Sequence, residues 1–327
     1  AGLYKKILME KEVDITLTLA GAMVPAGLHG IIADMIKNNF VDAIYSTGAN
    51  LFHDLHIALG YPFYRGDWKA NDVELKKAGL ERIYDVFIPQ ESLLAGDKFT
   101  FEFACPRIAE KCKNYGPLST AEFHYYLGKY ADEYVKNNEI KNNSILVQAY
   151  KREVPLFCPS PGDSTIGMDI ARYSIQSKDT PIIIDPNKDV LQTAALIYIS
   201  KKTAGIEIGG GAPKNFFMQT QPMIREVLGL KKSGHDYFIQ ITTDSPQWGG
   251  LSGATPQEAI SWGKLHEEAR NVVVYCDATI AIPLIYAYVL NEVEEREERR
   301  LFSKINNAVK VLKSDFQRKL PESNLEP

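Results

Sequence analysis

Residues Gly249–Ala278 read GGLSGATPQEAISWGKLHEEARNVVVYCDA. Thr255, followed by proline and then by Glu258, forms a capping-box pattern, which predicts that a helix begins directly after Thr255. The glycines before it predict a flexible loop that leads into this helix. We interpret the charged run 265–271 as helical and Val272–Tyr275 as a buried strand. The stretch therefore predicts loop, helix and strand in succession, as in an α/β protein.

The same alternation of strand and helix extends through the rest of the chain. The predicted strands are 13–19, 40–45, 156–158, 181–184, 204–208, 237–241 and 272–275. Predicted helices end near residues 37 and 59, cover 168–176, 190–201 and about 216–227, and continue after 280. The continuous apolar run 181–184 is typical of a parallel strand buried on both faces. We expect an α/β fold with a doubly wound, mostly parallel, Rossmann-like sheet and right-handed crossovers.

One segment interrupts this regularity. Residues 61–143 lack strand alternation and contain two predicted helices, at 71–77 and 120–137. We interpret them as a helical insertion within a single domain that covers residues 1–327. The segment 291–327 is predicted to be charged and helical, with the run 292–300 as a solvated helix face.

Composition narrows the classes of function. The 327 residues carry a formal net charge of −4, which argues against a nucleic-acid surface and is compatible with a cationic substrate. Four cysteines show no CxxC spacing, and Cys158 and Cys276 lie in apolar runs, so we expect reduced thiols and a cytoplasmic protein. No apolar run approaches the roughly 20 residues of a membrane span, and no signal peptide or metal site is predicted.

Three residues of the quoted stretch suggest a binding site for an amine. Glu258 and Trp262 are four positions apart, so a carboxylate and an indole share one helix face, which suits an ammonium group. Lys264 follows a glycine. The alternative is a capping glutamate, a core tryptophan and a solvated lysine. At about 100° per residue, a continuous helix would point Lys264 away from Trp262. Both side chains would then line one site only if that site wraps round the helix or if a second subunit closes the site.

Small and polar residues follow several predicted strands. Three glycines, 209–211, end one strand and allow a backbone to approach a pyrophosphate, although glycine turns are common. Similar positions at 47–49, 242–244 and 277–278 would meet at one edge of the sheet. Asp277 suits a helix N-cap as well as a ribose contact, and Asp163 lies in a turn sequence where aspartate is often a local cap.

The motifs SGATPQEAISWGK, GGGAPK and VYCDA together resemble deoxyhypusine synthase and its homospermidine synthase relatives, from about Thr16 to Leu290. The resemblance implies NAD as cofactor and Lys264 as the lysine that carries the covalent intermediate. It implies cofactor contacts at Ala22, Met23, Val24, Pro25, Thr47, Gly48, Ala49, His53, Asp163, Gly210, Thr243, Asp244, Asp277 and Ala278. The implied substrate-binding residues are Glu258, Trp262, His53, Asn215, Gly249, Gly250, Leu251 and Met168.

The activity implied by this resemblance is transfer of the 4-aminobutyl group of spermidine, through an imine on Lys264, to an acceptor amine. The acceptor would be a protein lysine, giving deoxyhypusine, or a small diamine, giving homospermidine. The alternatives are an amine dehydrogenase without transferase activity and an NAD- or polyamine-binding protein. Members of the family form homotetramers with sites at dimer interfaces, which the resemblance implies here too.

Four positions depart from the family pattern. Asn215 replaces the first histidine of a Lys-His-His motif, and an amide cannot accept a proton near neutral pH. Met168 and Leu251 stand where aspartates occur, and His53 stands where a glutamate occurs. Each lost charged hydrogen bond weakens recognition of an ammonium group by about 1–3 kcal/mol. We therefore expect an altered amine pocket beside a retained NAD site and a retained Lys264.

Overall fold

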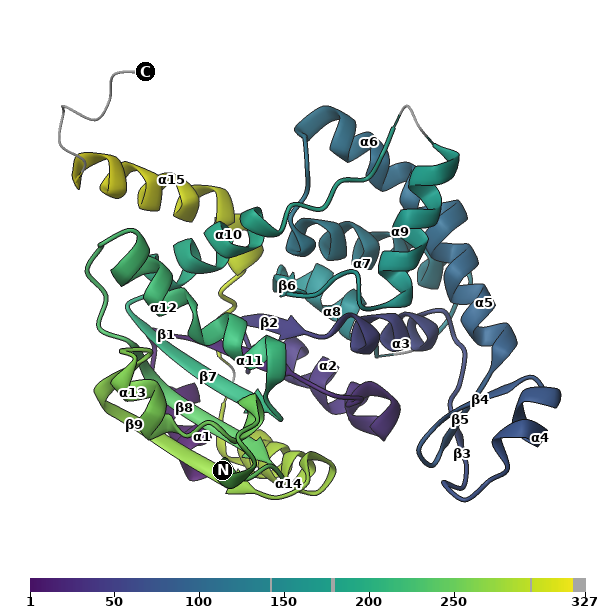
Figure 1. Ribbon diagram of the computed structural model, residues 1–327, viewed down its shortest axis with the longest axis horizontal. Helices are drawn as coiled ribbons and strands as arrows, with labels where there is room; N and C mark the ends of the chain where they lie inside the picture. The colour runs from purple at the N-terminus through teal and green to yellow at the C-terminus, as the bar shows by residue number, and fades with distance from the viewer. Residues whose placement is uncertain (142, 178–179, 295, 320–327) are drawn as a thin grey trace. The chain divides into compact units, whose positions relative to one another are not determined.

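The structure is a computed structural model that describes residues 1–141, 143–177, 180–294 and 296–319 (Figure 1). The chain forms two compact units. The first contains residues 1–20, 39–45 and the chain from 186 onward, and the second contains residues 21–38 and 46–185. The predicted insertion 61–143 lies within the second unit.

A parallel sheet with the strand order β6-β2-β1-β7-β8-β9 forms the framework of the fold. Its strands are β1 (Val13–Leu19), β2 (Ala43–Ser46), β6 (Leu156–Phe157), β7 (Lys202–Ile208), β8 (His235–Thr242) and β9 (Leu265–Tyr275). In chain order this is 3-2-1-4-5-6, the order of doubly wound dinucleotide-binding folds, and the direction of winding reverses between β1 and β7. The predicted fold class is confirmed.

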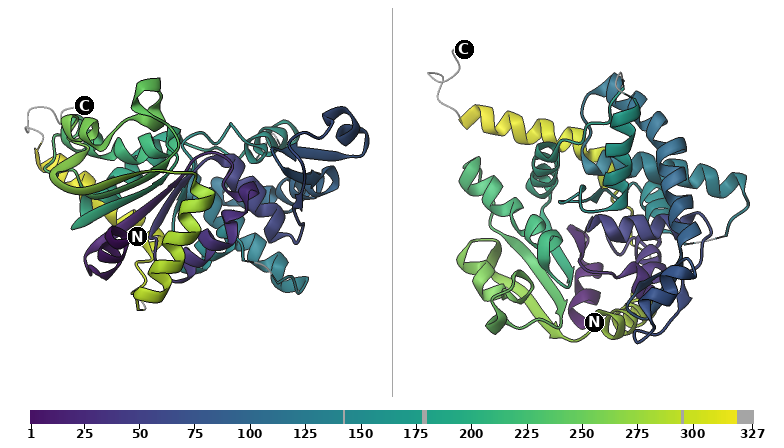
Figure 2. Two further views of the ribbon diagram at one scale, coloured as in Figure 1. Left: turned by 90° about the horizontal axis from the view of Figure 1, so that it is seen from below. Right: turned by 45° about the vertical axis from the view of Figure 1, so that its right-hand side comes forward.

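Helices cover both faces of the sheet in the first unit (Figures 1 and 2). They are α1 (Gly2–Met9), α10 (Pro186–Ile199), α11 (Gly211–Met218), α12 (Thr220–Pro222), α13 (Pro256–Ser261), α14 (Ala278–Glu292) and α15 (Leu301–Lys319), with the short turns η3 (Met223–Val227), η4 (Pro246–Trp248) and η5 (Leu251–Gly253). α1 and α14 lie on one face and α10 to α12 on the other. Ile15, Leu17 and Leu19 of β1 are fully buried, and each such side chain contributes roughly 1.5–3 kcal/mol of burial free energy.

The second unit is mainly helical. Its helices are α2 (His29–Lys37), α3 (Gly48–Ala58), α4 (Asp72–Lys77), α5 (Gln90–Lys98), α6 (Cys105–Tyr115), α7 (Thr120–Asn137), α8 (Ile145–Arg152) and α9 (Thr165–Gln176), with the irregular turns η1 (Val24–Leu28) and η2 (Phe99–Ala104). α7 covers the predicted range because Ser119 and Glu122 form a capping box at its start. A small antiparallel sheet, absent from our prediction for 61–143, has the order β3-β5-β4 and the strands β3 (Tyr64–Arg65), β4 (Leu80–Ile83) and β5 (Val86–Pro89).

Two further predictions of secondary structure were wrong. The charged run 265–271 is not helical but forms the first part of β9, the edge strand of the main sheet, where charged side chains can point into solvent. Residues 181–184 form only an isolated bridge, between Ile184 and Leu118, because α10 begins two residues later at Pro186.

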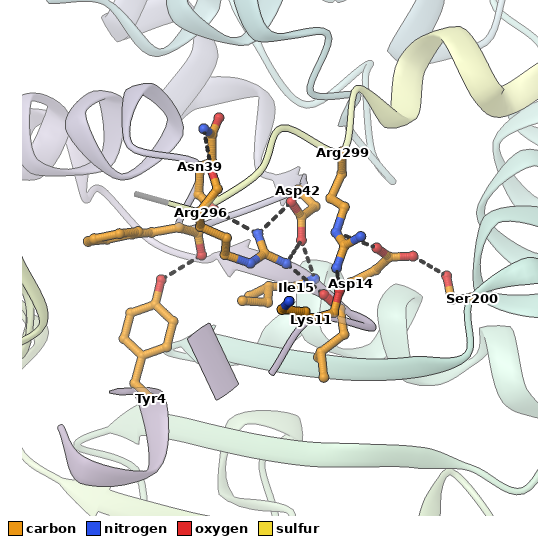
Figure 3. A network of polar contacts seen from close by, with 11 residues as sticks. Tyr4, Lys11, Asp14, Ile15, Asn39, Asp42, Ser200, Arg296 and Arg299 are labelled. Carbon is orange, nitrogen blue, oxygen red and sulfur yellow. Dashed lines mark hydrogen bonds and ion pairs between the residues drawn. The ribbon is translucent and has the colours of Figure 1, made fainter. Parts of the chain in front are cut away.

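The charged run 292–300 also differs from the predicted solvated helix face. α14 ends at Glu292 and α15 begins at Leu301, so the described residues between them are not helical. Arg296 is 7% exposed and pairs with the buried Asp42 (Figure 3). Residues 295 and 320–327, which belong to the predicted helical segment, lie outside the described residues.

The four cysteines carry reduced thiol groups; Cys158 is buried and Cys276 is half-buried. Within the described ranges, no helix is both long enough and apolar enough to cross a bilayer.

Candidate functional site

The first unit gathers many of the predicted site residues at one edge of its sheet. β7, β8 and β9 run parallel, so the segments that follow them start at the same edge. These segments contain Gly210, Thr243, Asp244, Gly249, Gly250, Leu251, Glu258, Trp262, Lys264, Asp277 and Ala278. The edge includes the reversal of winding between β1 and β7, which is where open α/β sheets bind their ligands.

α11 begins at this reversal. Gly210 is its N-cap and provides no side-chain hydrogen bond, so the first-turn N–H groups of the helix have no side-chain cap. Such a helix start suits a phosphate group. Gly210 lies so close to Ser252 that a Cβ at position 210 would be only 2.4 Å from the Ser252 Cα. The missing side chain at Gly210 therefore gives room to the η5 turn.

The structure brings Lys264 and Trp262 together. Lys264 Nζ lies 5.4 Å from the centroid of the Trp262 ring. The divergence expected from helical spacing does not occur, because α13 ends at Ser261 and Gly263 adopts the left-handed conformation with φ +62°. The Gly263 carbonyl accepts a hydrogen bond of 2.9 Å from Arg225 Nη1, which holds the turn. Trp262 is exposed and not part of the core, whereas Lys264 is half-buried.

The start of α13 places Glu258 on the same short helix. Thr255 Oγ1 accepts a hydrogen bond of 3.3 Å from the Glu258 N–H, and the predicted helix start is confirmed. The Glu258 side chain is exposed, so its carboxylate is accessible to a ligand. A carboxylate, an indole and a primary amine thus lie on one segment, residues 258–264. This set can bind a cationic amine and attack an electrophilic carbon.

Asp277 has the capping role that its sequence allowed. Its Oδ1 accepts hydrogen bonds from Thr279 N at 2.8 Å and from Thr279 Oγ1 at 2.6 Å, at the N-terminus of α14. These bonds hold the pKa of Asp277 below its ordinary value. Its carboxylate remains exposed, so capping and a ribose contact are compatible.

In the second unit a buried asparagine joins two of the predicted cofactor segments. Asn50 Oδ1 accepts a hydrogen bond of 3.1 Å from Val24 N, and Asn50 Nδ2 donates one of 3.2 Å to Thr47 Oγ1. The segments Ala22–Pro25 and Thr47–Ala49 therefore lie together. Gly48 lies against Ser164, where a Cβ would be 2.5 Å from the Ser164 Oγ, and this brings the exposed Asp163 close to the same place.

Two of the substrate positions in the second unit provide no negative charge. Burial lowers the pKa of His53 to about 4, so its imidazole is neutral at physiological pH. Met168 on α9 is 60% exposed, whereas the adjacent Asp169 is buried on another face of the helix. Asp169 does not replace a carboxylate at position 168.

The sequence analysis did not identify two buried charged residues of the first unit as part of the site. They are Glu207 of β7 and Lys214 of α11. A single glutamate inside the otherwise apolar strand 204–208 was the available signal, because a charged residue in a strand buried on both faces needs a local partner.

Residues 1–289 match the deoxyhypusine synthase family profile. A deoxyhypusine synthase-like protein of Nostoc punctiforme is 42% identical over 96% of this chain and 80% of its own length. A Methanosarcina acetivorans protein named "Probable deoxyhypusine synthase 2" is 42% identical over 88% of this chain and 80% of its own. The crystal structure of an Entamoeba histolytica protein named for deoxyhypusine synthase superposes with a TM-score of 0.58 at 15% identity, over 91% of this chain and 87% of that chain, and supports the fold.

Proposed function

The chain belongs to the deoxyhypusine synthase family, and from this membership we propose that it is an NAD-dependent aminobutyl transferase that acts on spermidine through Lys264. The observation that carries the proposal is the placement of Lys264 Nζ 5.4 Å from the Trp262 ring, on the segment that also carries Glu258. The acceptor is an amine, either a protein lysine or a small diamine.

The residues present are compatible with NAD. In the first unit the uncapped start of α11 can receive a phosphate, and Thr243, Asp244, Asp277 and Ala278 follow neighbouring parallel strands. In the second unit Asn50 orders the backbone of 22–25 and 47–49, beside Asp163. Bound NAD would supply reversible hydride transfer at the carbon next to the secondary amine of spermidine. We assign the cofactor contacts to the residues that the resemblance implies.

The side chains of the first unit would then carry out the transfer. Glu258 pairs with a cationic amine and Trp262 contacts it through its ring face. The Lys264 amine attacks the oxidised carbon, 1,3-diaminopropane leaves, and the aminobutyl group remains on Lys264 as an imine. The acceptor amine displaces Lys264 and takes the group as an imine, and the hydride held by the reduced cofactor would convert this imine to the product amine. Asn215 orients a ligand by hydrogen bonds only, and Gly249, Gly250 and Leu251 line the loop before α13.

Self-association is part of the proposal. α14 exposes Ile280, Leu284 and Tyr288, which are four positions apart and share one face of the helix, and an exposed apolar stripe of this kind is typical of a protein–protein interface. We propose that this face packs against a second copy in a homotetramer. Sedimentation of the chain as a monomer would contradict this part of the proposal.

The test is the identification of products by mass spectrometry. Spermidine and NAD are incubated with the protein and with putrescine, agmatine or candidate protein acceptors, and borohydride is added to trap an imine on Lys264. We expect 1,3-diaminopropane, an aminobutylated acceptor and a trapped adduct, all abolished by Lys264→Ala. Diaminopropane without an aminobutyl product would instead indicate the amine dehydrogenase, and spermidine binding with no product at all would indicate a polyamine-binding protein.

A further inference from the structure

A carboxylate without a hydrogen bond lies in the middle of the main sheet. Glu207 of β7 is 0% exposed, and neither of its side-chain oxygens has a hydrogen-bond partner among the described residues. Burial raises the pKa of Glu207 to about 8, while the positive charge of Lys214 acts in the opposite direction. A buried carboxyl group of this kind is stable in its neutral form or beside an opposite charge.

The buried Lys214 side chain is hydrogen-bonded to a loop of the candidate site. The Lys214 side chain is 5% exposed, and its Nζ donates hydrogen bonds to Gln240 Oε1 at 3.1 Å and to the Ala254 carbonyl at 2.7 Å. Burial lowers the pKa of Lys214, and Glu207 is the strongest influence that raises it. Three other charged groups also face the Lys214 ammonium: Glu258 of α13, Lys264 after that helix, and Asp244 after β8.

Gln240 of β8 binds the same loop at a second carbonyl. Its Nε2 donates hydrogen bonds to Ser252 O at 2.8 Å and to Gly209 O at 2.9 Å. The loop is thus held at Ser252 and at Ala254, directly before Thr255, the N-cap of α13. Because α13 spans only Pro256–Ser261, its position depends on how its N-terminal loop is held.

We propose that Lys214 and Gln240 are positioning residues: the Lys214 Nζ and the Gln240 side-chain amide hold the Ser252–Ala254 loop so that Glu258, Trp262 and Lys264 keep their relative placement. The inference rests on the proposed function for its catalytic consequence, but the anchoring itself can be tested without any activity. Neither residue is assigned a contact with the substrate. Replacing Glu207 and Lys214 together by apolar residues of similar size leaves no single charge buried, so the double change separates folding from function.

The first experiment measures loop order. Hydrogen exchange is followed in the peptide 245–264 for the native protein, for Gln240→Leu, for Lys214→Met and for the double variant Glu207→Leu/Lys214→Met. We expect exchange in this peptide to rise by about tenfold in each variant, corresponding to about 1.4 kcal/mol, while exchange in β1 and α15 stays unchanged. Glu297→Gln, which changes an exposed glutamate, serves as the control. Unchanged exchange in 245–264 in the folded double variant would overturn the proposal.

The second experiment measures the consequence at Lys264. The rate of borohydride-trapped adduct formation from spermidine and NAD is measured as a function of pH. We expect a loss of about tenfold or more at every pH in the double variant and in Gln240→Leu, because each change removes a hydrogen bond that holds the Ser252–Ala254 loop. Native rates in both variants would contradict the positioning role. An absence of adduct in the native protein, with exchange in 245–264 altered as expected, would instead reject the proposed function and retain the anchoring.

Discussion

Arg296 and Asp42, which are 254 residues apart in the sequence, form a bidentate ion pair with Nη1–Oδ1 and Nη2–Oδ2 distances of 2.8 Å each (Figure 3). Both side chains are buried, and Arg296 also donates to the carbonyls of Asn39 and Val13. Asp42 Oδ2 accepts a further hydrogen bond from Ile15 N. The pair therefore ties the segment after α14 to the start of β1 and the residues before β2.

Replacement of Arg296 by methionine should strongly destabilise the protein. The change leaves the Asp42 carboxylate buried without its cation, which costs about 3–5 kcal/mol of unfolding free energy. Denaturant unfolding measures this loss. Arg318→Ala is the control, because Arg318 pairs with Asp315 at the surface and should contribute at most about 1 kcal/mol. A loss for Arg296→Met no larger than that of the control would show that the buried pair is not needed.

Replacement of Gly263 by alanine should disrupt the Trp262–Lys264 arrangement. An L-residue is strained at φ +62°, and the new Cβ would lie 1.7 Å from Arg225 Nη1. We expect trapping of spermidine on Lys264 to fall by about a hundredfold, as small misplacements of reacting groups do. Gly79→Ala is a matched control, since Gly79 has φ +69° and open space around it, and it should show only the strain of about 1–2 kcal/mol. Equal trapping in both variants would speak against the arrangement.

Two substitutions can separate the capping role of Asp277 from its proposed ligand-binding role. Asparagine is as good an N-cap as aspartate, so Asp277→Asn should retain stability at neutral pH, whereas Asp277→Ala should lose about 1 kcal/mol. If Asp277 contacts the cofactor as proposed, both variants should bind NAD about tenfold more weakly in calorimetry. Native NAD affinity in Asp277→Asn would restrict this residue to capping.

Acid stability should depend on His56. The His56 ring packs on Phe52 with centroids 4.3 Å apart, and its two nitrogens have no partner among the described side chains and backbone. Burial, and to a lesser extent His53, lower the pKa of His56 to about 3. Because the folded pKa lies below the unfolded value of about 6.5, its contribution is fully present above pH 6.5 and is lost as the pH falls toward 3.

The matching variant is His56→Leu, which removes this titration. The dependence of unfolding free energy on pH should become shallower between about pH 6 and pH 3, by up to about 1.4 kcal/mol per pH unit. Denaturant unfolding at a series of pH values measures the slope. An identical slope in the native protein and the variant would exclude His56 as a source of acid sensitivity.

A carboxylate at position 168 should strengthen amine binding. Met168 is exposed, so Met168→Asp is not expected to disturb folding, and it adds the charge that Asp169 does not provide. We expect the KM for spermidine to fall by about fivefold or more, because fivefold corresponds to the lower end of the free energy of a charged hydrogen bond. Met168→Asn changes size and polarity without charge and should have little effect. A fall in KM of the same size with asparagine would assign the gain to polarity and not to charge.

Local patterns in the sequence determined much of the fold. β1 was predicted at its observed bounds because its alternating β-branched residues suit a buried strand. α7 was also predicted at its observed bounds, and in the structure a capping box marks its start. The resemblance carried by SGATPQEAISWGK led to the family. The placement of glycine-rich segments after parallel strands also followed from the pattern, because strands of one direction end at one edge.

Only the tertiary structure decided the features that depend on long-range contacts. The run 265–271 looks helical by charge, but it forms a strand because β8 provides a partner for its backbone. The charged run around Arg296 suggests a solvated side chain, but Arg296 is buried and forms an ion pair with Asp42. Lys264 approaches Trp262 because the chain turns at Gly263, whose carbonyl accepts a hydrogen bond from Arg225. Lys214 bonds the Ala254 carbonyl because two segments that are distant in the sequence pack together. Local spacing sets periodicity and helix ends, whereas a partner for a charge or a strand edge can lie anywhere in the chain.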